Sequence, residues 1–160
     1  QFISCMQGPG LEYECVLGEF DHPDGIGTIR HEKCHFVDLV TLKGIAPRNH
    51  NFGVHYHGQI RVYETGDYTF YVLADDGATL YIDGVGVVDA SLSRGERECS
   101  GAIGLEEGGH DICVHYIQRK GDMALKVSFE GPGVAKQEID RDIVEDDNLL
   151  IGHLYFACGK

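Results

Sequence analysis

Short apolar runs separated by turn-forming residues dominate the middle of the chain. Residues 59–64 alternate between apolar and polar, whereas residues 68–73 are apolar on both faces, as in a strand that is covered on both sides. Residues 79–82 and 86–88 flank Asp83-Gly84, a dipeptide that favours a tight hairpin because both of its residues accept positive φ. The pattern predicts β-strands in each of these four ranges.

Two later runs, residues 112–117 and 124–129, are predicted to be strands that pair with each other. In the second run Leu125, Val127 and Phe129 alternate with polar residues, which is the period of a half-buried antiparallel strand. No stretch before residue 134 keeps a helical periodicity over three turns. Short strands with regular turns predict an all-β fold, a sandwich or a barrel.

The two ends of the chain are less regular than its middle. Residues 8–50 are rich in Gly, His, Asp and Pro, which favours long loops with short strands. Residues 136–149 are strongly acidic and are predicted to form a short helix or a solvated loop, and residues 149–156 a closing strand. The 160 residues contain no internal repeat or low-complexity linker, so we predict a single domain, 1–160.

The charge of the chain limits its partners. The formal net charge is -13, with 26 acidic and 13 basic residues. A field of that sign repels phosphate backbones and anionic lipids but attracts cations, so we expect no nucleic-acid binding and no insertion into a membrane. The sequence contains no GxSxG or P-loop motif, and we expect no enzymatic activity. The first residues lack the features of a signal peptide, and we interpret them as the start of a mature domain or of an excised segment.

The cysteines indicate the compartment. None of the six belongs to a CxxC pair, and an even number of scattered cysteines is typical of three disulfides in an extracellular protein. The alternative is a set of buried thiols in a cytosolic protein. The sequence does not select a pairing, although a bond from the last cysteine to an early one would hold the two ends together. The six residues are Cys5, Cys15, Cys34, Cys99, Cys113 and Cys158.

The most informative segment is residues 66–84. It contains a Gly-x-Tyr-x-Phe strand, an Ala-Asp-Asp-Gly turn at 74–77 and a strand that ends in Asp-Gly. In this order the blocks resemble the core signature of the PA-fourteen (PA14) domain family, and the likeness covers residues 52–133, with divergent, disulfide-tied extensions at 1–51 and 134–160. The resemblance implies a two-sheet antiparallel β-sandwich that is usually a module of a larger secreted or cell-surface protein.

The resemblance also implies a metal site. In the lectin members of the family, two consecutive aspartates joined by a cis peptide hold Ca²⁺, which coordinates hydroxyls of a glycan. Adjacent side chains of a regular strand point to opposite faces, so Asp75 and Asp76 can share one ion only where that geometry is broken. Calcium tolerates irregular oxygen cages better than magnesium does. We therefore predict Ca²⁺ at Asp75 and Asp76; the alternative is an ordinary polar turn.

Further ligands are expected from the loop around residues 118–122. Gln118 can supply an amide oxygen and Asp122 a carboxylate to the metal. Gln118, Arg119 and Lys120 are predicted to contact the sugar together with the aspartate pair, although Arg119 and Lys120 also fit a solvated basic turn. The Asn that is typical of the adhesins is missing at the aligned position.

Histidines offer a second kind of metal chemistry. His55 and His57 would share one face of a strand, and His31, Cys34 and His35 are close in sequence, but two histidines alone rarely make a site. The leading prediction is thus a calcium-dependent carbohydrate-binding or adhesion module that recognises a glycan or glycoprotein on a cell surface. The alternative is a protein-interaction or spacer domain of a larger extracellular protein, with calcium structural or absent.

Overall fold

The computed structural model describes residues 10–27, 35–91 and 95–139. Within these ranges the chain forms strands and one short 3-10 helix, and no helix has the length and apolar character that a membrane crossing requires. In chain order the elements are β1 (Leu11–Leu17), η1 (Pro23–Ile26), β2 (His35–Val37), β3 (Phe52–Val62), β4 (Gly66–Asp75), β5 (Gly77–Ile82), β6 (Val85–Ala90), β7 (Arg97–Leu105), β8 (Gly108–Gln118), β9 (Ala124–Gly131) and β10 (Val134–Glu138).

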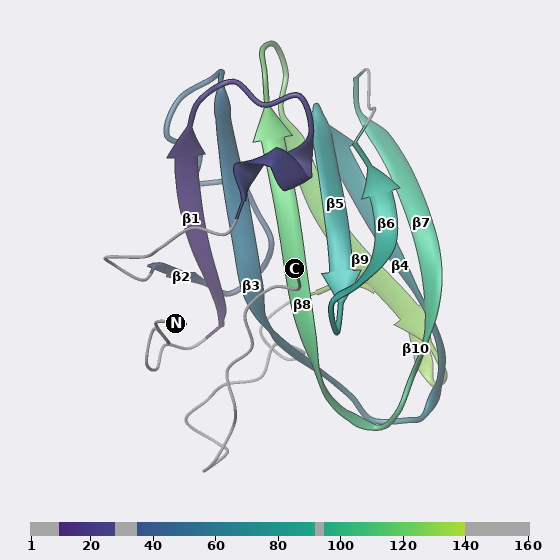
Figure 1. Ribbon diagram of the computed structural model, residues 1–160. Helices are drawn as coiled ribbons and strands as arrows, with labels where there is room; N and C mark the ends of the chain where they lie inside the picture. The colour runs from purple at the N-terminus through teal and green to yellow at the C-terminus, as the bar shows by residue number, and fades with distance from the viewer. Residues whose placement is uncertain (1–9, 28–34, 92–94, 140–160) are drawn as a thin grey trace.

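The strands form two facing layers (Figure 1). A six-stranded sheet has the order β2-β1-β3-β8-β5-β6, and a four-stranded sheet has the order β10-β9-β4-β7. Every strand pairing is antiparallel. This arrangement confirms the predicted two-sheet antiparallel β-sandwich.

The core lies between the two sheets and follows from the alternation along each strand. On β4 every second residue from Tyr68 to Ala74 is buried, and β9 places Phe129 directly opposite Phe70. The rings of this pair lie 6.1 Å apart and nearly parallel. Burial of an aromatic or large aliphatic side chain is worth about 1.5–3 kcal/mol relative to exposure, so the inward rows of both sheets hold the layers together.

The predicted hairpin between residues 79–82 and 86–88 is confirmed. Leu80 lies opposite Val88, and the turn residues Asp83 and Gly84 have φ values of 49° and 76°. Residues of this type accept the left-handed region at little cost, which is why the dipeptide could be recognised from sequence.

The predicted pairing of residues 112–117 with 124–129 is wrong. β8 pairs with β3 and β5, whereas β9 pairs with β4 and β10, so the loop after Gln118 carries the chain from one sheet to the other. Alternation shows that a strand has a buried face, but a buried face can belong to either layer of a sandwich.

Two other expectations need correction. Residues 136–138 belong to strand β10 and not to a helix or loop, while residues 140–149 and the predicted closing strand at 149–156 lie outside the described residues. The sequence also gave no sign of β7, whose central Gly101 lies so close to β6 that an added Cβ would be 1.8 Å from the carbonyl oxygen of Val87. Where a strand packs closely against a neighbouring strand it contains small residues, and it then lacks the β-branched and aromatic residues by which strands are recognised in a sequence.

Candidate functional site

Asp75 and Asp76 lie where the chain passes from the four-stranded sheet to the six-stranded sheet. Asp75 is the last residue of β4, and Gly77 is the first residue of β5. The peptide bond between the two aspartates is cis, as the family resemblance implied. A Cβ at position 77 would lie 2.9 Å from the carbonyl oxygen of Ser91, so glycine is required for the close approach of the chain behind the pair.

Burial and neighbouring negative charge both act on the carboxylate of Asp75, which is 8% exposed. Burial is the main cause of its raised pKa, and the charge of Asp76 and a hydrogen bond with it raise the pKa further. The charges of Asp122 and Glu96 act in the same direction. Asp76 and Asp122, which were predicted from sequence to bind metal, thus act on Asp75 by their charge, as does Glu96, which was not predicted.

Gln118 is a buried residue that forms hydrogen bonds with the loop beside the aspartates. It is 1% exposed, and its amide nitrogen donates to the carbonyl oxygens of Gly121 at 3.0 Å and of Asp122 at 3.3 Å. Its amide oxygen lies 2.9 Å from the hydroxyl of Tyr116, which also contacts the carbonyl oxygen of Asp75. The side chain thus connects the loop after β8 to the aspartate pair.

Arg119 and Lys120 contact Asp76 through the backbone. The N–H groups of both residues donate to Asp76 Oδ2, at 2.6 Å and 3.3 Å respectively. The guanidinium of Arg119 donates to the carbonyl oxygens of Phe20 and Asp21, at 3.2 Å and 2.8 Å. The two residues therefore fix the loop to Asp76, and the side chain of Arg119 attaches the segment after β1 to the same edge of the sandwich.

Asp24 is a site residue that the sequence did not single out. From η1 its carboxylate accepts hydrogen bonds from Thr79 at 2.7 Å, from His115 at 3.0 Å and from the hydroxyl of Tyr81. Burial raises its pKa, but these three hydrogen bonds outweigh burial and leave the pKa lowered. Asp24 and Asp89 border a shallow pocket of about 290 Å³ beside Tyr81. The donors come from distant strands, so no local motif marks this aspartate.

The cysteine prediction is wrong in part. Cys15 on β1 and Cys99 on β7 are free thiols. The sulfur of Cys15 donates to the carbonyl oxygen of Ile45, and burial raises the pKa of this thiol to about 11. Cys113 is disulfide-bonded. The other predicted disulfide residues, Cys5, Cys34 and Cys158, lie outside the described residues, as does His31.

The donor set around Asp75 fits a hard divalent cation. The carboxylates of Asp75 and Asp76 offer oxygen ligands, and after burial the negative charge of Asp76 is the next cause of the raised pKa of Asp75, so the two charges repel each other. A bound cation would relieve that repulsion. Carboxylate oxygens in an irregular loop arrangement are the ligands that Ca²⁺ accepts, and the nearby backbone carbonyls of the 118–122 loop are of the same chemical type.

Comparison with known proteins identifies relatives of this fold. A family model described as the PA14 domain matches residues 8–142, which extends well beyond the core match found in the sequence. Anti-sigma-I factor RsgI3 of Acetivibrio thermocellus is 32% identical over 89 residues, which are 55% of this chain and 14% of that protein. The chain therefore spans a small part of its curated relative.

Solved structures give the same picture. An anti-sigma factor domain-containing protein has a TM-score of 0.70 at 23% identity, over 92% of this chain and 50% of that chain. The PA14 domain of the MpAFP antifreeze protein has a TM-score of 0.69 at 15% identity, over 91% and 96%. The epithelial adhesin 6 A domain of Candida glabrata, in complex with Galb1-3GlcNAc, has a TM-score of 0.66 at 13% identity, over 90% of both chains. At these identities the likeness establishes the fold.

Proposed function

This chain belongs to the PA14 domain family, and on that premise we propose that it is a calcium-dependent carbohydrate-binding module with no catalytic activity of its own. The observation that carries the proposal is the position of Asp75 and Asp76 at the crossing between the two sheets, with the loop that carries Asp122 held to Asp76 by two backbone hydrogen bonds. Asp75 is buried and Asp76 is half-buried, and a bound Ca²⁺ would offset the free-energy cost of holding these two neighbouring carboxylates away from water.

Each residue of this edge has a separate role in the proposal. Asp75, Asp76 and Asp122 hold the ion, which supplies open coordination positions for neighbouring sugar hydroxyls. Gln118 keeps the loop in place through its hydrogen bonds to Gly121 and Asp122. Lys120 is exposed and is available to donate to a sugar hydroxyl, whereas the guanidinium of Arg119 is already engaged by two backbone carbonyls.

The nature of the partner is supported by structural relatives. The adhesin domain of the same fold has a bound glycan, Galb1-3GlcNAc, and another relative is described as a PA14 sugar-binding domain from an RTX adhesin. By analogy we propose a glycan or glycoprotein as the partner and an extracellular or cell-surface location. Because one small site contacts few sugar atoms, we expect weak affinity for a single glycan and a gain from multivalency.

A second function is favoured by one observation, the likeness to anti-sigma factor proteins of which this chain spans only a part. In this alternative the domain is a protein-interaction or spacer domain of a longer protein, and calcium is structural or absent. The side chains of Arg119 and Gln118 form hydrogen bonds within the domain, which is expected if they do not contact a sugar.

The experiment that separates the two functions uses the 160-residue chain. Calcium alone is titrated into the chelator-treated protein by isothermal titration calorimetry, and a glycan array is then probed with calcium and with chelator. We expect calcium binding, and glycan signals that disappear in chelator. Calcium binding without any glycan signal would favour the spacer, and no calcium binding at millimolar concentration would exclude the proposed site.

The matched variants are Asp75→Asn with Asp76→Asn, and Asp67→Asn as the control. Asp67 is an exposed residue of the same strand, so its replacement removes one charge at a distance in sequence from the pair. The paired variant is expected to keep the β-type circular dichroism spectrum and to lose calcium binding. Unchanged calcium binding in the folded paired variant would show that the ion lies elsewhere.

A further inference from the structure

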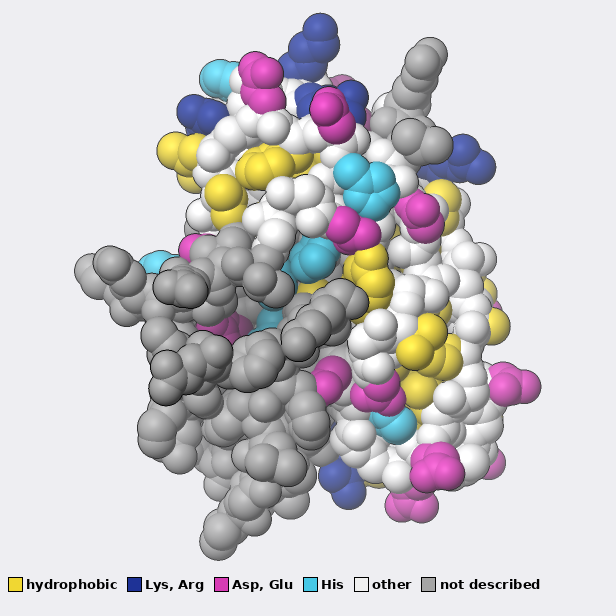
Figure 2. All heavy atoms as spheres, in the orientation of Figure 1, with side chains coloured by type: hydrophobic (Ala, Val, Ile, Leu, Met, Phe, Trp, Pro, Cys, Tyr) yellow, Lys and Arg dark blue, Asp and Glu magenta, His cyan; other side chains and the backbone are white. Residues whose placement is uncertain are grey.

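The outer face of the six-stranded sheet carries a second group of ligating side chains. Residue His55 on β3 lies directly opposite His115 on β8, and both side chains point away from the core formed by Val54 and Tyr116. Figure 2 looks onto this face and shows histidine and acidic side chains there. These residues belong to different strands from Asp75 and do not take part in the calcium site proposed above.

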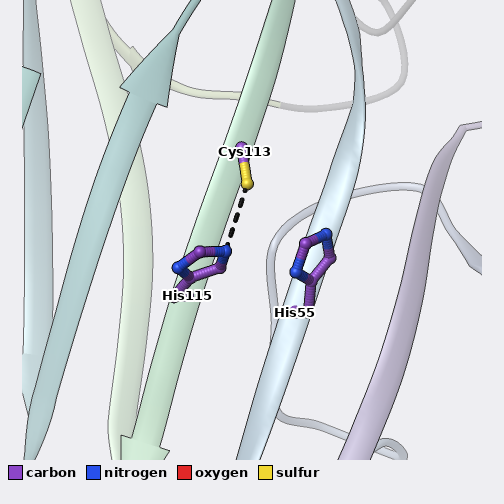
Figure 3. A group of neighbouring side chains, drawn as sticks. All are labelled: His55, Cys113 and His115. Carbon is purple, nitrogen blue, oxygen red and sulfur yellow. Dashed lines mark hydrogen bonds between the residues drawn. The ribbon is translucent and has the colours of Figure 1, made fainter. Parts of the chain in front are cut away.

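Three ligand atoms meet at this place (Figure 3). One atom each of His55, Cys113 and His115 lie within 4.8 Å of one another, and the three residues are only 6%, 3% and 8% exposed. The sulfur of Cys113 is 3.4 Å from Nε2 of His115. In a tetrahedral zinc site with Zn–S of about 2.3 Å and Zn–N of about 2.0–2.1 Å, sulfur and nitrogen are about 3.5 Å apart. The first two ligands therefore already have the required spacing.

A hydrogen bond to Asp24 fixes the orientation of the His115 ring. Its Nδ1 donates to Asp24 Oδ1 at 3.0 Å, which leaves Nε2 as the atom that faces the sulfur. A carboxylate that holds the second ring nitrogen of a histidine is the usual outer partner of a metal-ligating imidazole, because it sets the tautomer and increases the basicity of the ligand. Helix η1, which contributes Asp24, contacts β3, β5 and β8 and so packs onto this face of the sheet.

Cys113 is disulfide-bonded, and a disulfide sulfur is not an anionic ligand. In this state the group offers two imidazoles. We propose that His55, His115 and Cys113 form a site for a borderline-soft divalent metal such as Zn²⁺, and that the disulfide and the metal compete for the sulfur of Cys113. The inference is independent of the proposed carbohydrate binding.

Reduction of the disulfide by a dithiol makes the sulfur of Cys113 available to a metal. A dithiol supplies two electrons and two protons, the S–S bond breaks, each sulfur leaves as a thiol, and the reductant becomes a cyclic disulfide. When the metal binds, the Cys113 thiol releases its proton to solvent and the thiolate donates an electron pair to the metal. Two imidazole nitrogens and one thiolate make three protein ligands, and water completes a tetrahedron.

The test uses the 160-residue protein, freed of metal and kept without calcium, either oxidised or reduced. A phosphine replaces the dithiol as reductant because it does not contribute a thiol ligand. Cobalt(II) is titrated into both forms and is then displaced with Zn²⁺. We expect thiolate-to-cobalt charge transfer and tetrahedral visible bands, at one equivalent, in the reduced form alone. Equal bands in both forms, or none in the reduced form, would overturn the proposal.

Variants separate this site from the other cysteines of the reduced chain. Cys113→Ser, followed by circular dichroism to confirm folding, is expected to lose the charge-transfer band, and a retained band would assign the metal to other cysteines and overturn the proposal. His55→Ala and His115→Ala leave every cysteine in place and should weaken cobalt binding at least as much as Asp24→Asn, for which about a 10- to 100-fold loss is expected. The exposed His50→Ala is the matched control and should bind as the wild type does.

Discussion

The hydrogen bonds to Asp76 give a quantitative prediction for the calcium-free protein. Asp76 Oδ2 accepts from the backbone N–H of Arg119 at 2.6 Å and of Lys120 at 3.3 Å. A hydrogen bond to a charged group contributes about 1.5–3 kcal/mol, and we take the lower end for the short bond because the loop is exposed, with a smaller addition from the long one. We expect Asp76→Ala to lower the free energy of unfolding by about 2 kcal/mol.

The expected loss corresponds to a shift that is easily measured. For a chain of this size about 1 kcal/mol changes Tm by roughly 2–4 °C, so Asp76→Ala should melt about 4–8 °C below wild type in chelator. Thermal unfolding followed by circular dichroism at neutral pH is the assay. Asp67→Ala, on the same strand and exposed, removes the same charge without these hydrogen bonds and should melt within about 1 °C of wild type.

Calcium then separates the two contributions of Asp76. At a calcium concentration of about 100 times Kd, binding should stabilise wild type and Asp67→Ala by about 2.7 kcal/mol, and should not stabilise Asp76→Ala. If Asp76→Ala melts at the wild-type temperature in chelator, the loop does not depend on these bonds. If it gains as much from calcium as wild type, the assignment of the ion to this edge is refuted.

Three further predictions concern other parts of the framework. Tyr116→Phe removes the buried hydroxyl that contacts the carbonyl oxygen of Asp75, and denaturant unfolding should show a loss of about 1–3 kcal/mol. The pKa of His110 is raised because hydrogen bonds, including one with Asp83, outweigh the effect of burial. His110→Ala should therefore lose the most stability relative to wild type below pH about 6.5, and the difference in free energy of unfolding should shrink as the pH rises through the raised pKa of His110. Gly101→Ala places a Cβ 1.8 Å from a carbonyl oxygen of β6 and should leave little folded protein by circular dichroism, whereas an alanine substitution that preserves the wild-type melting curve would contradict the packing of these edge strands.

The aspartate pair could be recognised from sequence because its signal is local. Asp75 and Asp76 stand in a fixed order with a preceding strand and a following glycine, so the motif can be read without knowledge of the fold. Asp122 was selected because the lectin members of the family place further ligands in this loop and a carboxylate can bind the metal. Two backbone hydrogen bonds hold the loop to Asp76, while the role of Asp122 as a metal ligand stays a prediction.

Other parts of the picture depend on residues that are distant in sequence. Cys113 and His115 lie on the same face of β8 by alternation alone, but His55 joins them only because β3 pairs with β8 in one particular register. Asp24 reaches His115 from a segment 91 residues earlier, through a side-chain hydrogen bond that no spacing rule encodes. The free thiols of Cys15 and Cys99 could not be predicted either, because cysteine spacing in the sequence does not determine which sulfurs come within bonding distance.

The residue pattern was enough to predict an all-β fold of sandwich or barrel type, most of the strands and the hairpin turn with positive φ. These properties follow from alternation and from the backbone preferences of single residues, which act over a few positions. The two-sheet sandwich and the importance of the two consecutive aspartates came from the family resemblance. Which sheet each of β8 and β9 joins, and which histidine and carboxylate lie together on the outer face, depended on the packing of the whole chain. Hydrophobic burial is non-directional, so an apolar strand face is buried equally well in either sheet. The pairing partner and the register of a strand are therefore fixed only when all strands pack together.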